Sequence, residues 1–129
     1  MQIGINSQKG EAEQMNPGYF SISLAVKDIQ KSKEFYEGFG FKAVDGCGSV
    51  EEKWLMLENG DAKIGLFEGM FEQNLITFNP KNGRKFFRAA KEIGAQILYQ
   101  SQDIEEEGNG ACSFSMIDPD GNQILVDQF

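Results

Sequence analysis

Residues 19–41 read YFSISLAVKDIQKSKEFYEGFGF, and this stretch predicts a strand followed directly by a helix. In its first eight residues, large apolar side chains alternate with smaller or polar ones, which is typical of a strand with one apolar face. Asp28 is a favourable helix N-cap, and apolar side chains then recur at helical spacing as far as Phe39. Gly38 and Gly40 are expected to end the helix.

The order of elements continues with three more strands and then repeats. A strand is expected at 41–45, then a flexible link Gly46-Cys47-Gly48, then a hairpin of strands 54–58 and 62–68 around Asn59-Gly60-Asp61. The second half predicts these elements in turn: a strand at 75–78, a helix at 81–93 opened by Asn79-Pro80, a strand at 95–99, an acidic loop at 101–110, and a hairpin of strands 111–117 and 122–127. From Tyr19 onward the chain therefore has an internal repeat of roughly 55 residues.

The repeat predicts an α+β fold in which two βαβββ modules form a curved mixed sheet with a concave cleft. We expect one domain over residues 18–129, with modules at 18–70 and 71–129. Residues 1–17 are polar and rich in Gln, Glu and Gly, so we expect a flexible N-terminal arm or a segment that pairs with a partner chain.

In the second helix, the helical spacing separates apolar from basic residues. Phe86, Phe87, Ala90 and Ile93 are expected to face the core. The basic residues are expected mostly on the solvent side, namely Lys81, Arg84, Lys85, Arg88 and Lys91. Cys112 alternates with apolar neighbours and is expected to be a small buried residue.

If the helices cover the apolar face of each sheet, the opposite face is available to a small-molecule ligand. The period of two assigns to this ligand-binding cleft Tyr19, Ser21, Ser23, Trp54, Gly65, Phe67, Leu75, Thr77, Ser115, Leu125 and Asp127. The same alternation adds Met56, Lys63, Ser113 and Gln123. Trp54 either packs within the fold or stacks on a flat ligand.

Charge and composition exclude several classes of function. The chain of 129 residues carries 12 Lys and Arg against 20 Asp and Glu, a net charge of −8, which argues against nucleic-acid and anionic-membrane partners. It contains no histidine, so catalytic schemes built on a histidine base are excluded. Two cysteines are too few for a disulfide framework, and no apolar run is long enough for a membrane span, so a cytoplasmic protein is expected.

Two segments resemble signatures of the vicinal oxygen chelate superfamily, which includes glyoxalase I, extradiol dioxygenases, and fosfomycin- and bleomycin-resistance proteins. Residues 23–32, with Phe35-Tyr36 and Gly40-Phe41, are similar to the signature of its first module. Residues 118–124, DPDGNQI, are similar to its closing hairpin. The resemblance covers residues 19–127 and implies this fold and a homodimer, which would also cover exposed sheet edges.

The resemblance also implies where a metal ion would be held in metal-dependent members. Those four positions correspond here to Ser21, Gly65, Leu75 (or Asn74 if the register shifts by one residue) and Leu125. Divalent metals require several carboxylate or imidazole ligands, which these residues do not supply. We therefore expect neither a metal nor another cofactor.

The first functional hypothesis is a metal-independent binding protein that sequesters a cationic or aromatic compound, with Glu105, Glu106 and Glu107 as an acidic rim. The alternative is a metal-free isomerase, lyase or transferase, for which Asp127, Glu68 or Tyr99 could carry protons. A third hypothesis is a non-catalytic interaction module.

Overall fold

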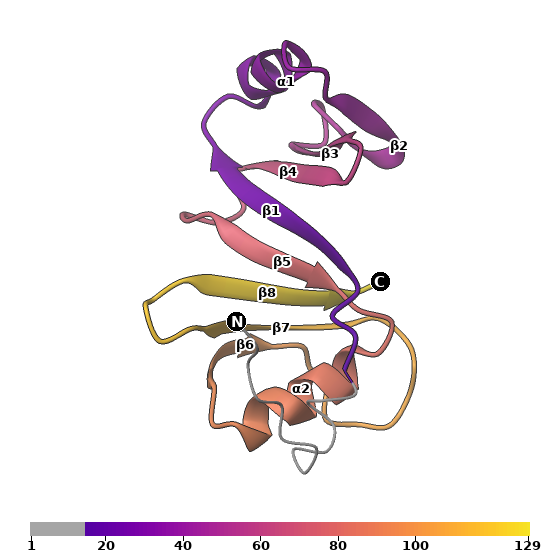
Figure 1. Ribbon diagram of the computed structural model, residues 1–129, viewed down its shortest axis with the longest axis vertical. Helices are drawn as coiled ribbons and strands as arrows, with labels where there is room; N and C mark the ends of the chain where they lie inside the picture. The colour runs from indigo at the N-terminus through magenta and orange to yellow at the C-terminus, as the bar shows by residue number, and fades with distance from the viewer. Residues whose placement is uncertain (1–14) are drawn as a thin grey trace, which may run out of the picture. The chain divides into compact units, whose positions relative to one another are not determined.

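The computed structural model describes residues 15–129, which form a mixed eight-stranded sheet with two helices (Figure 1). The elements, in chain order, are β1 (Tyr19–Val26), α1 (Ile29–Glu37), β2 (Lys42–Ser49), β3 (Trp54–Asn59), β4 (Ala62–Glu68), β5 (Leu75–Asn79), α2 (Gly83–Glu92), β6 (Gln96–Gln100), β7 (Cys112–Ile117) and β8 (Gln123–Gln128). The predicted repeat of βαβββ is confirmed. The expected N-terminal arm, up to residue 14, lies outside the described residues.

The strand order is β2-β3-β4-β1-β5-β8-β7-β6, so the order β2-β3-β4-β1 has its counterpart in β6-β7-β8-β5. β1 pairs with β4 in parallel, whereas β3 pairs with β4, and β7 with β8, in antiparallel fashion. The predicted α+β class with a mixed sheet is confirmed.

The chain forms two compact units. We call Phe20–Thr77 the first unit, and Phe78–Phe129 together with residues 15–19 the second unit. The predicted domain at 18–129 and the module boundary at 70 and 71 stay predictions.

In the first unit, α1 packs on one face of its strands and contacts β4. The core contains Ile29 of α1 with Leu55, Leu57 and Leu66 of β3 and β4, all buried. Leu24 and Val26 of β1 pack against this cluster. Because side chains alternate along a strand, Ser21 and Ser23 lie on the opposite face of β1.

The start of α1 is held by two carboxylates. Asp28 accepts a hydrogen bond from the backbone N–H of Lys31 (3.2 Å), which confirms the predicted N-cap. Glu68 of β4 accepts from the N–H of Ile29 (2.9 Å), and its other oxygen lies 2.9 Å from the ammonium of Lys53. The Ile29 hydrogen bond, followed by the Lys53 contact, lowers the pKa of Glu68 below its ordinary value. Glu68 is therefore a poor proton donor near neutral pH.

In the second unit, α2 contacts β7 and β8. Phe114 is fully buried, and its ring lies 5.8 Å from Phe86 and 5.2 Å from Phe87, measured between centroids. Cys112 is buried in the same cluster, as expected, and burial raises the pKa of its thiol.

The prediction that a strand ends at residue 45 is wrong, because β2 continues through Gly46-Cys47-Gly48 to Ser49. Its pairing with β3 shifts register between Ala43 and Gly48. Gly48 has a φ of +86°, and a Cβ there would meet the carbonyl oxygen of Trp54. Glycine therefore lets the irregular strand stay paired where another residue would clash.

The predicted start and end of the second helix also differ from the structure. Its N-cap is Asn82, which accepts from the N–H of Lys85 (3.0 Å), while the side chain of Asn79 donates to the carbonyl of Asp127 (2.8 Å). Ile93, expected in the core, is 71% exposed. It lies at the C-cap, beyond the last helical residue, so the helical spacing no longer sets its direction.

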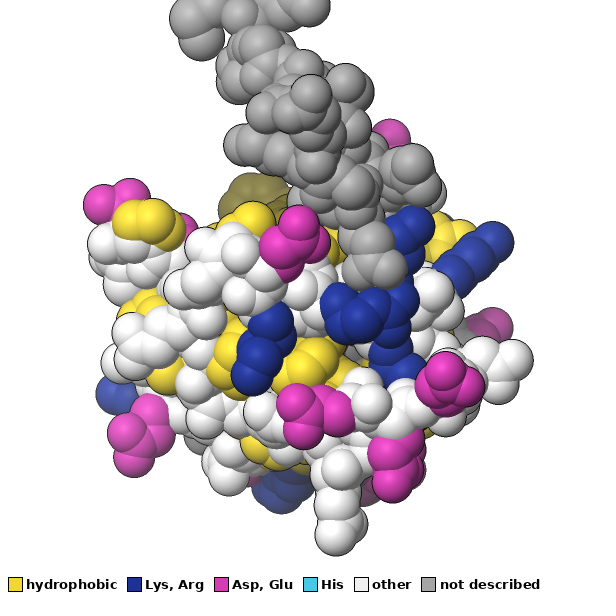
Figure 2. Space-filling model, turned by 90° about the horizontal axis from the view of Figure 1, so that it is seen from below, with side chains coloured by type: hydrophobic (Ala, Val, Ile, Leu, Met, Phe, Trp, Pro, Cys, Tyr) yellow, Lys and Arg dark blue, Asp and Glu magenta, His cyan; other side chains and the backbone are white. Residues whose placement is uncertain are grey.

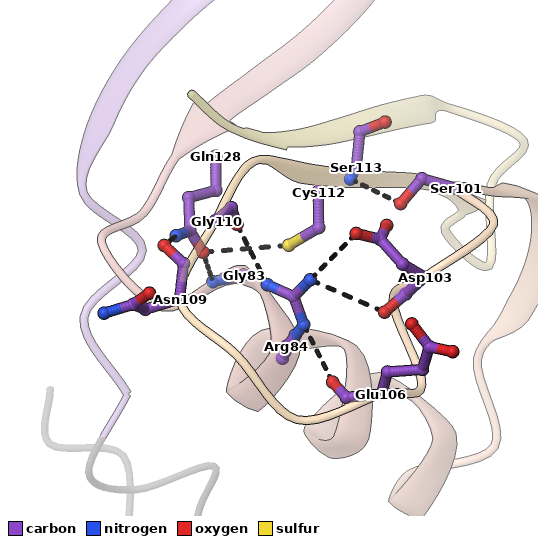
Figure 3. Close-up of polar contacts among 10 residues, drawn as sticks. All are labelled: Gly83, Arg84, Ser101, Asp103, Glu106, Asn109, Gly110, Cys112, Ser113 and Gln128. Carbon is purple, nitrogen blue, oxygen red and sulfur yellow. Dashed lines mark hydrogen bonds and ion pairs between the residues drawn. The ribbon is translucent and has the colours of Figure 1, made fainter.

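Arg84 was expected on the solvent side of the helix, and this prediction is wrong, because only 5% of the residue is exposed. Its guanidinium donates to the carbonyl oxygens of Glu106 and Gly110, both at 2.9 Å (Figure 3). It also lies 3.2 Å from a carboxylate oxygen of Asp103. The loop between β6 and β7 thus folds back over α2 and encloses the charged group in acceptors.

Gln128 of β8 makes a second connection to this loop. Its side-chain oxygen accepts from the N–H of Gly83 (2.7 Å) and its side-chain nitrogen donates to the carbonyl of Asn109 (2.8 Å). The thiol of Cys112 also donates to the Gln128 oxygen, at 3.7 Å. The loop is therefore attached to both α2 and β8.

Candidate functional site

The first unit has a group of small hydroxyl side chains on the face opposite α1. Ser21 and Ser23 of β1 and Thr77 of β5 are all buried. The hydroxyls of Ser23 and Thr77 lie 2.7 Å apart and form a hydrogen bond. Buried hydroxyls normally have partners, and this pair satisfies part of that requirement within the protein itself.

An aromatic cluster lies on the same face of β3 and β4. Trp54 and Phe67 are cross-strand partners, and their rings are stacked with centroids 6.4 Å apart and planes 11° apart. Phe71, which follows β4, lies 5.1 Å from Phe67 between centroids. Leu55 and Leu57 are in the core, so Trp54 and Met56 belong to the opposite face. Because all four residues of this stretch are apolar, only the burial of Leu55 and Leu57 shows which side chains of β3 face the core.

Gly65 of β4 is the cross-strand partner of Met56 and lies beside the ring of Phe67. A Cβ at this position would be 2.7 Å from a ring carbon of Phe67 and 2.9 Å from the sulfur of Met56. The space that a metal-binding side chain would need is therefore filled by neighbouring side chains. Only glycine leaves room for the observed packing.

The residues at the implied metal positions do not fit a divalent cation. Gly65 has no side chain, and its neighbours occupy the adjacent space. Leu75 and Leu125 offer no ligand atom, and Ser21 offers one hydroxyl. Within residues 15–129, no three His, Cys, Asp or Glu side chains lie together as a metal site would require.

In the second unit, the face opposite α2 carries a carboxyl group beside hydroxyls. Asp127 is the cross-strand partner of Ser113, so their side chains lie on the same face. The hydroxyl of Tyr99 is 3.3 Å from that of Ser113. Asp127 is half-buried, and this burial raises the pKa of its carboxyl group above the ordinary value. Within the described residues its carboxylate has neither a hydrogen bond nor an ion pair.

The predicted cleft residues are divided between the two units. The first unit holds Ser21, Ser23, Trp54, Gly65, Phe67, Leu75 and Thr77. Ser115, Leu125 and Asp127 belong to the second unit, where Ser115 and Leu125 are cross-strand partners. Tyr19 is 68% exposed and lines a separate cavity beside α2. That these residues bind a ligand together stays a prediction.

The sequence reasoning missed two features of these surfaces. Phe71 follows Gly69 and Met70 in a connecting segment, where no strand period predicts its direction. The cavity beside α2 includes Lys81 and Lys85, which their helical spacing indicated only as solvent-exposed. No local pattern in the sequence predicts this cavity, because it requires residues 15–19 to lie beside the start of α2.

Comparison with known families gives a match over nearly the whole chain. Residues 18–126 match the model of the Glyoxalase/Bleomycin resistance protein/Dioxygenase superfamily, in agreement with the resemblance of the two signature segments. No curated protein sequence matches the chain. No helix in the described part of the chain is long and apolar enough to cross a membrane.

Three solved structures illustrate the similarity of fold. NAD-dependent benzaldehyde dehydrogenase from Legionella pneumophila has a TM-score of 0.67 at 16% identity, covering 85% of this chain and 98% of that one. A superfamily member from Vibrio splendidus 12B01 has a TM-score of 0.62 at 16% identity, covering 85% and 97%. Methylmalonyl-CoA epimerase from Mycobacterium tuberculosis has a TM-score of 0.56 at 13% identity, covering 86% and 85%. At such low identities the likeness extends to the fold and not to the activity.

Proposed function

Because this chain belongs to the Glyoxalase/Bleomycin resistance protein/Dioxygenase superfamily, we propose that it is a small-molecule binding protein that works without a metal ion. Its ligand-binding residues are those of the predicted cleft that lie in the first unit, with the aromatic cluster as the main contact. The ligand is a cationic or aromatic compound, which the protein sequesters without changing it chemically.

The observation that carries this proposal is the packing around Gly65. At a position where metal-dependent members have a ligand side chain, the ring of Phe67 and the sulfur of Met56 take up the space. The surface around Gly65 is therefore apolar and aromatic, with Trp54 stacked on Phe67. Such a surface suits a flat ring, because aromatic pairs favour offset stacking.

The charge of the protein supports a cationic ligand. A net charge of −8 gives the molecule a negative potential that attracts cations. Attraction of this kind weakens as salt screens it, so the affinity for a cation should fall at high ionic strength.

Trp54 is the single tryptophan of the chain, so its fluorescence reports on the aromatic cluster alone. We would titrate the protein with bleomycin and with phenyltrimethylammonium and follow the fluorescence of Trp54. We would then measure the melting temperature with each compound, and with divalent metals in the presence or absence of a chelator. Saturable quenching is expected, together with stabilisation of about 2.7 kcal/mol at a ligand concentration of ~100 Kd. Metals are expected to leave the melting temperature unchanged.

The variant Phe67→Leu should weaken binding, whereas Phe35→Leu, on the exposed side of α1, should not. Equal weakening by both variants would contradict the assignment of the aromatic cluster. Chelator-reversible stabilisation by a divalent metal would overturn metal independence.

A second candidate function is metal-free acid–base catalysis, and one observation favours it. Asp127 is a half-buried carboxyl group with a raised pKa beside the hydroxyls of Ser113 and Tyr99. Such a group can exchange a proton nearer to neutral pH than an ordinary aspartate. Turnover of a glutathione hemithioacetal that persists with excess chelator and is lost in Asp127→Asn would favour the enzyme. Absence of turnover in the wild type would argue against this substrate.

A further inference from the structure

A cavity of about 510 Å³ lies in the second unit, beside the start of α2. The residues that line it come from two segments: Met15, Asn16, Gly18 and Tyr19, and Asn79, Lys81, Asn82 and Lys85. Its size falls in the range of small-molecule sites. None of the residues of the predicted cleft except Tyr19 contributes to it, so the cavity is separate from the surfaces discussed above.

The wall formed by residues 15–19 is placed by direct backbone contact. Gly18 has a φ of +77°, and a Cβ on it would meet the carbonyl oxygen of Asn79. The side-chain oxygen of Asn16 accepts from the N–H of Gly18 (2.9 Å). This segment therefore lies against the end of β5 and gives the cavity a wall opposite the lysines of the α2 segment.

The polar side chains that line the cavity offer mainly hydrogen-bond donors, except Asn79, whose NH₂ group already donates to the carbonyl of Asp127. Lys81 and Lys85 supply two ammonium groups. Asn16 and Asn82 each use the side-chain oxygen for a backbone N–H, so each has an amide NH₂ group available to a ligand. No acidic side chain is among the described residues that line the cavity.

The two lysines have no ionic partner in the described part of the chain, although the protein has an excess of acidic residues. Lys33 pairs with Glu37, and Lys53 with Glu68. The nearby Arg84 has Asp103. Figure 2 shows Lys and Arg side chains gathered on the face seen from below, with Asp and Glu around them. Positive charge is thus concentrated locally on an acidic protein.

We propose that this cavity binds the phosphate group of a small phosphomonoester. A phosphomonoester carries a charge of about −1.5 to −2 near neutral pH and three acceptor oxygens, which matches two ammonium groups and two amides. A carboxylate would neutralise only one of the two lysines. Tyr19 and Met15 give the cavity an apolar wall for the organic part of the ligand. This site does not depend on the function proposed above.

The test is isothermal titration calorimetry of the full chain with phenyl phosphate, inorganic phosphate and benzoate. Phenyl phosphate should bind in a saturable way, more tightly than either of the others, and more weakly as salt is raised. The double variant Lys81→Gln/Lys85→Gln should lower its affinity about tenfold or more. The control Lys42→Gln removes one exposed positive charge from β2 in the first unit and should change the affinity less than about twofold.

The proposal would be overturned by absence of saturable binding of phenyl phosphate to the wild type, by benzoate binding as tightly as phenyl phosphate, or by equal losses in the control and the double variant. Unchanged melting temperatures would show that the variants are folded. A variant Gly18→Ala provides an independent check, because it displaces one wall and leaves both lysines. It should also weaken binding of phenyl phosphate.

Discussion

At the scale of single residues, Gly65 controls the packing of the aromatic cluster. A methyl group there would lie 2.7 Å from the Phe67 ring and 2.9 Å from the Met56 sulfur. Gly65→Ala should therefore cost about 1–3 kcal/mol of unfolding free energy, as overpacking does, and should change the fluorescence of Trp54, whose ring stacks on Phe67. Urea denaturation followed by fluorescence measures both effects. Gly110→Ala is the control, because a Cβ at Gly110 meets no neighbour, and a comparable loss there would contradict the argument.

Asp127 predicts a pH dependence of stability with a definite sign. Burial raises the pKa of its carboxyl group in the folded state, so the folded protein holds this proton more tightly than the unfolded chain does. Stability is therefore lost as pH rises from the unfolded pKa through the raised folded pKa. Asp127→Asn should remove this loss, so the variant gains stability over the wild type across that interval and keeps the gain at neutral pH. Urea titrations between about pH 4 and pH 7 test this, and parallel curves for the two proteins would refute it.

At the scale of elements, Glu68 connects β4 to the first turn of α1. Its pKa is lowered in the folded state by the N–H of Ile29 and by Lys53, so its stabilising effect is present above the unfolded pKa and is lost as pH falls through the folded pKa. Glu68→Gln should reduce the melting temperature at pH 7 and have little effect at a pH below the folded pKa. Glu51→Gln, at an exposed residue, should have little effect at either pH. A constant difference between wild type and Glu68→Gln at all pH values would show that charge is not the cause.

Arg84 also connects two elements, because its side chain holds the loop between β6 and β7 against α2. Arg84→Met leaves the carbonyl oxygens of Glu106 and Gly110 without their donor, and should cost about 1.5–3 kcal/mol. Amide hydrogen exchange should rise in residues 103–110 more than in the core strands. Lys81→Met, at an exposed residue before the helix, should leave exchange in the loop unchanged. If amide exchange in the loop stays slow in Arg84→Met, the hydrogen bonds of Gln128 are enough to hold the loop in place.

At the scale of the whole molecule, the sequence predicted the elements whose side chains follow one local period. β1 and β4 were predicted with their observed bounds, because side chains alternate along β1 and the Asn59-Gly60-Asp61 turn marks the start of β4. The burial of Arg84 could not be predicted, because it depends on a loop about twenty residues further along the chain. The alternation identified which residues share a face, but the position of the Phe67 ring over Gly65 is decided by packing between β3 and β4.

The assembly state is the last prediction, and charge makes it testable. We expect a homodimer, as the family resemblance implies, and β2 and β6 are the edge strands of the sheet order that a partner could cover. Each chain carries a net charge of −8, so two copies repel each other. Since salt screens this repulsion, dimerisation should strengthen between about 0.05 M and about 0.5 M NaCl. Light scattering should give a mass of 28.8 kDa (2 × 14.4 kDa) at high salt, and a mass of 14.4 kDa at every salt and protein concentration would refute the dimer.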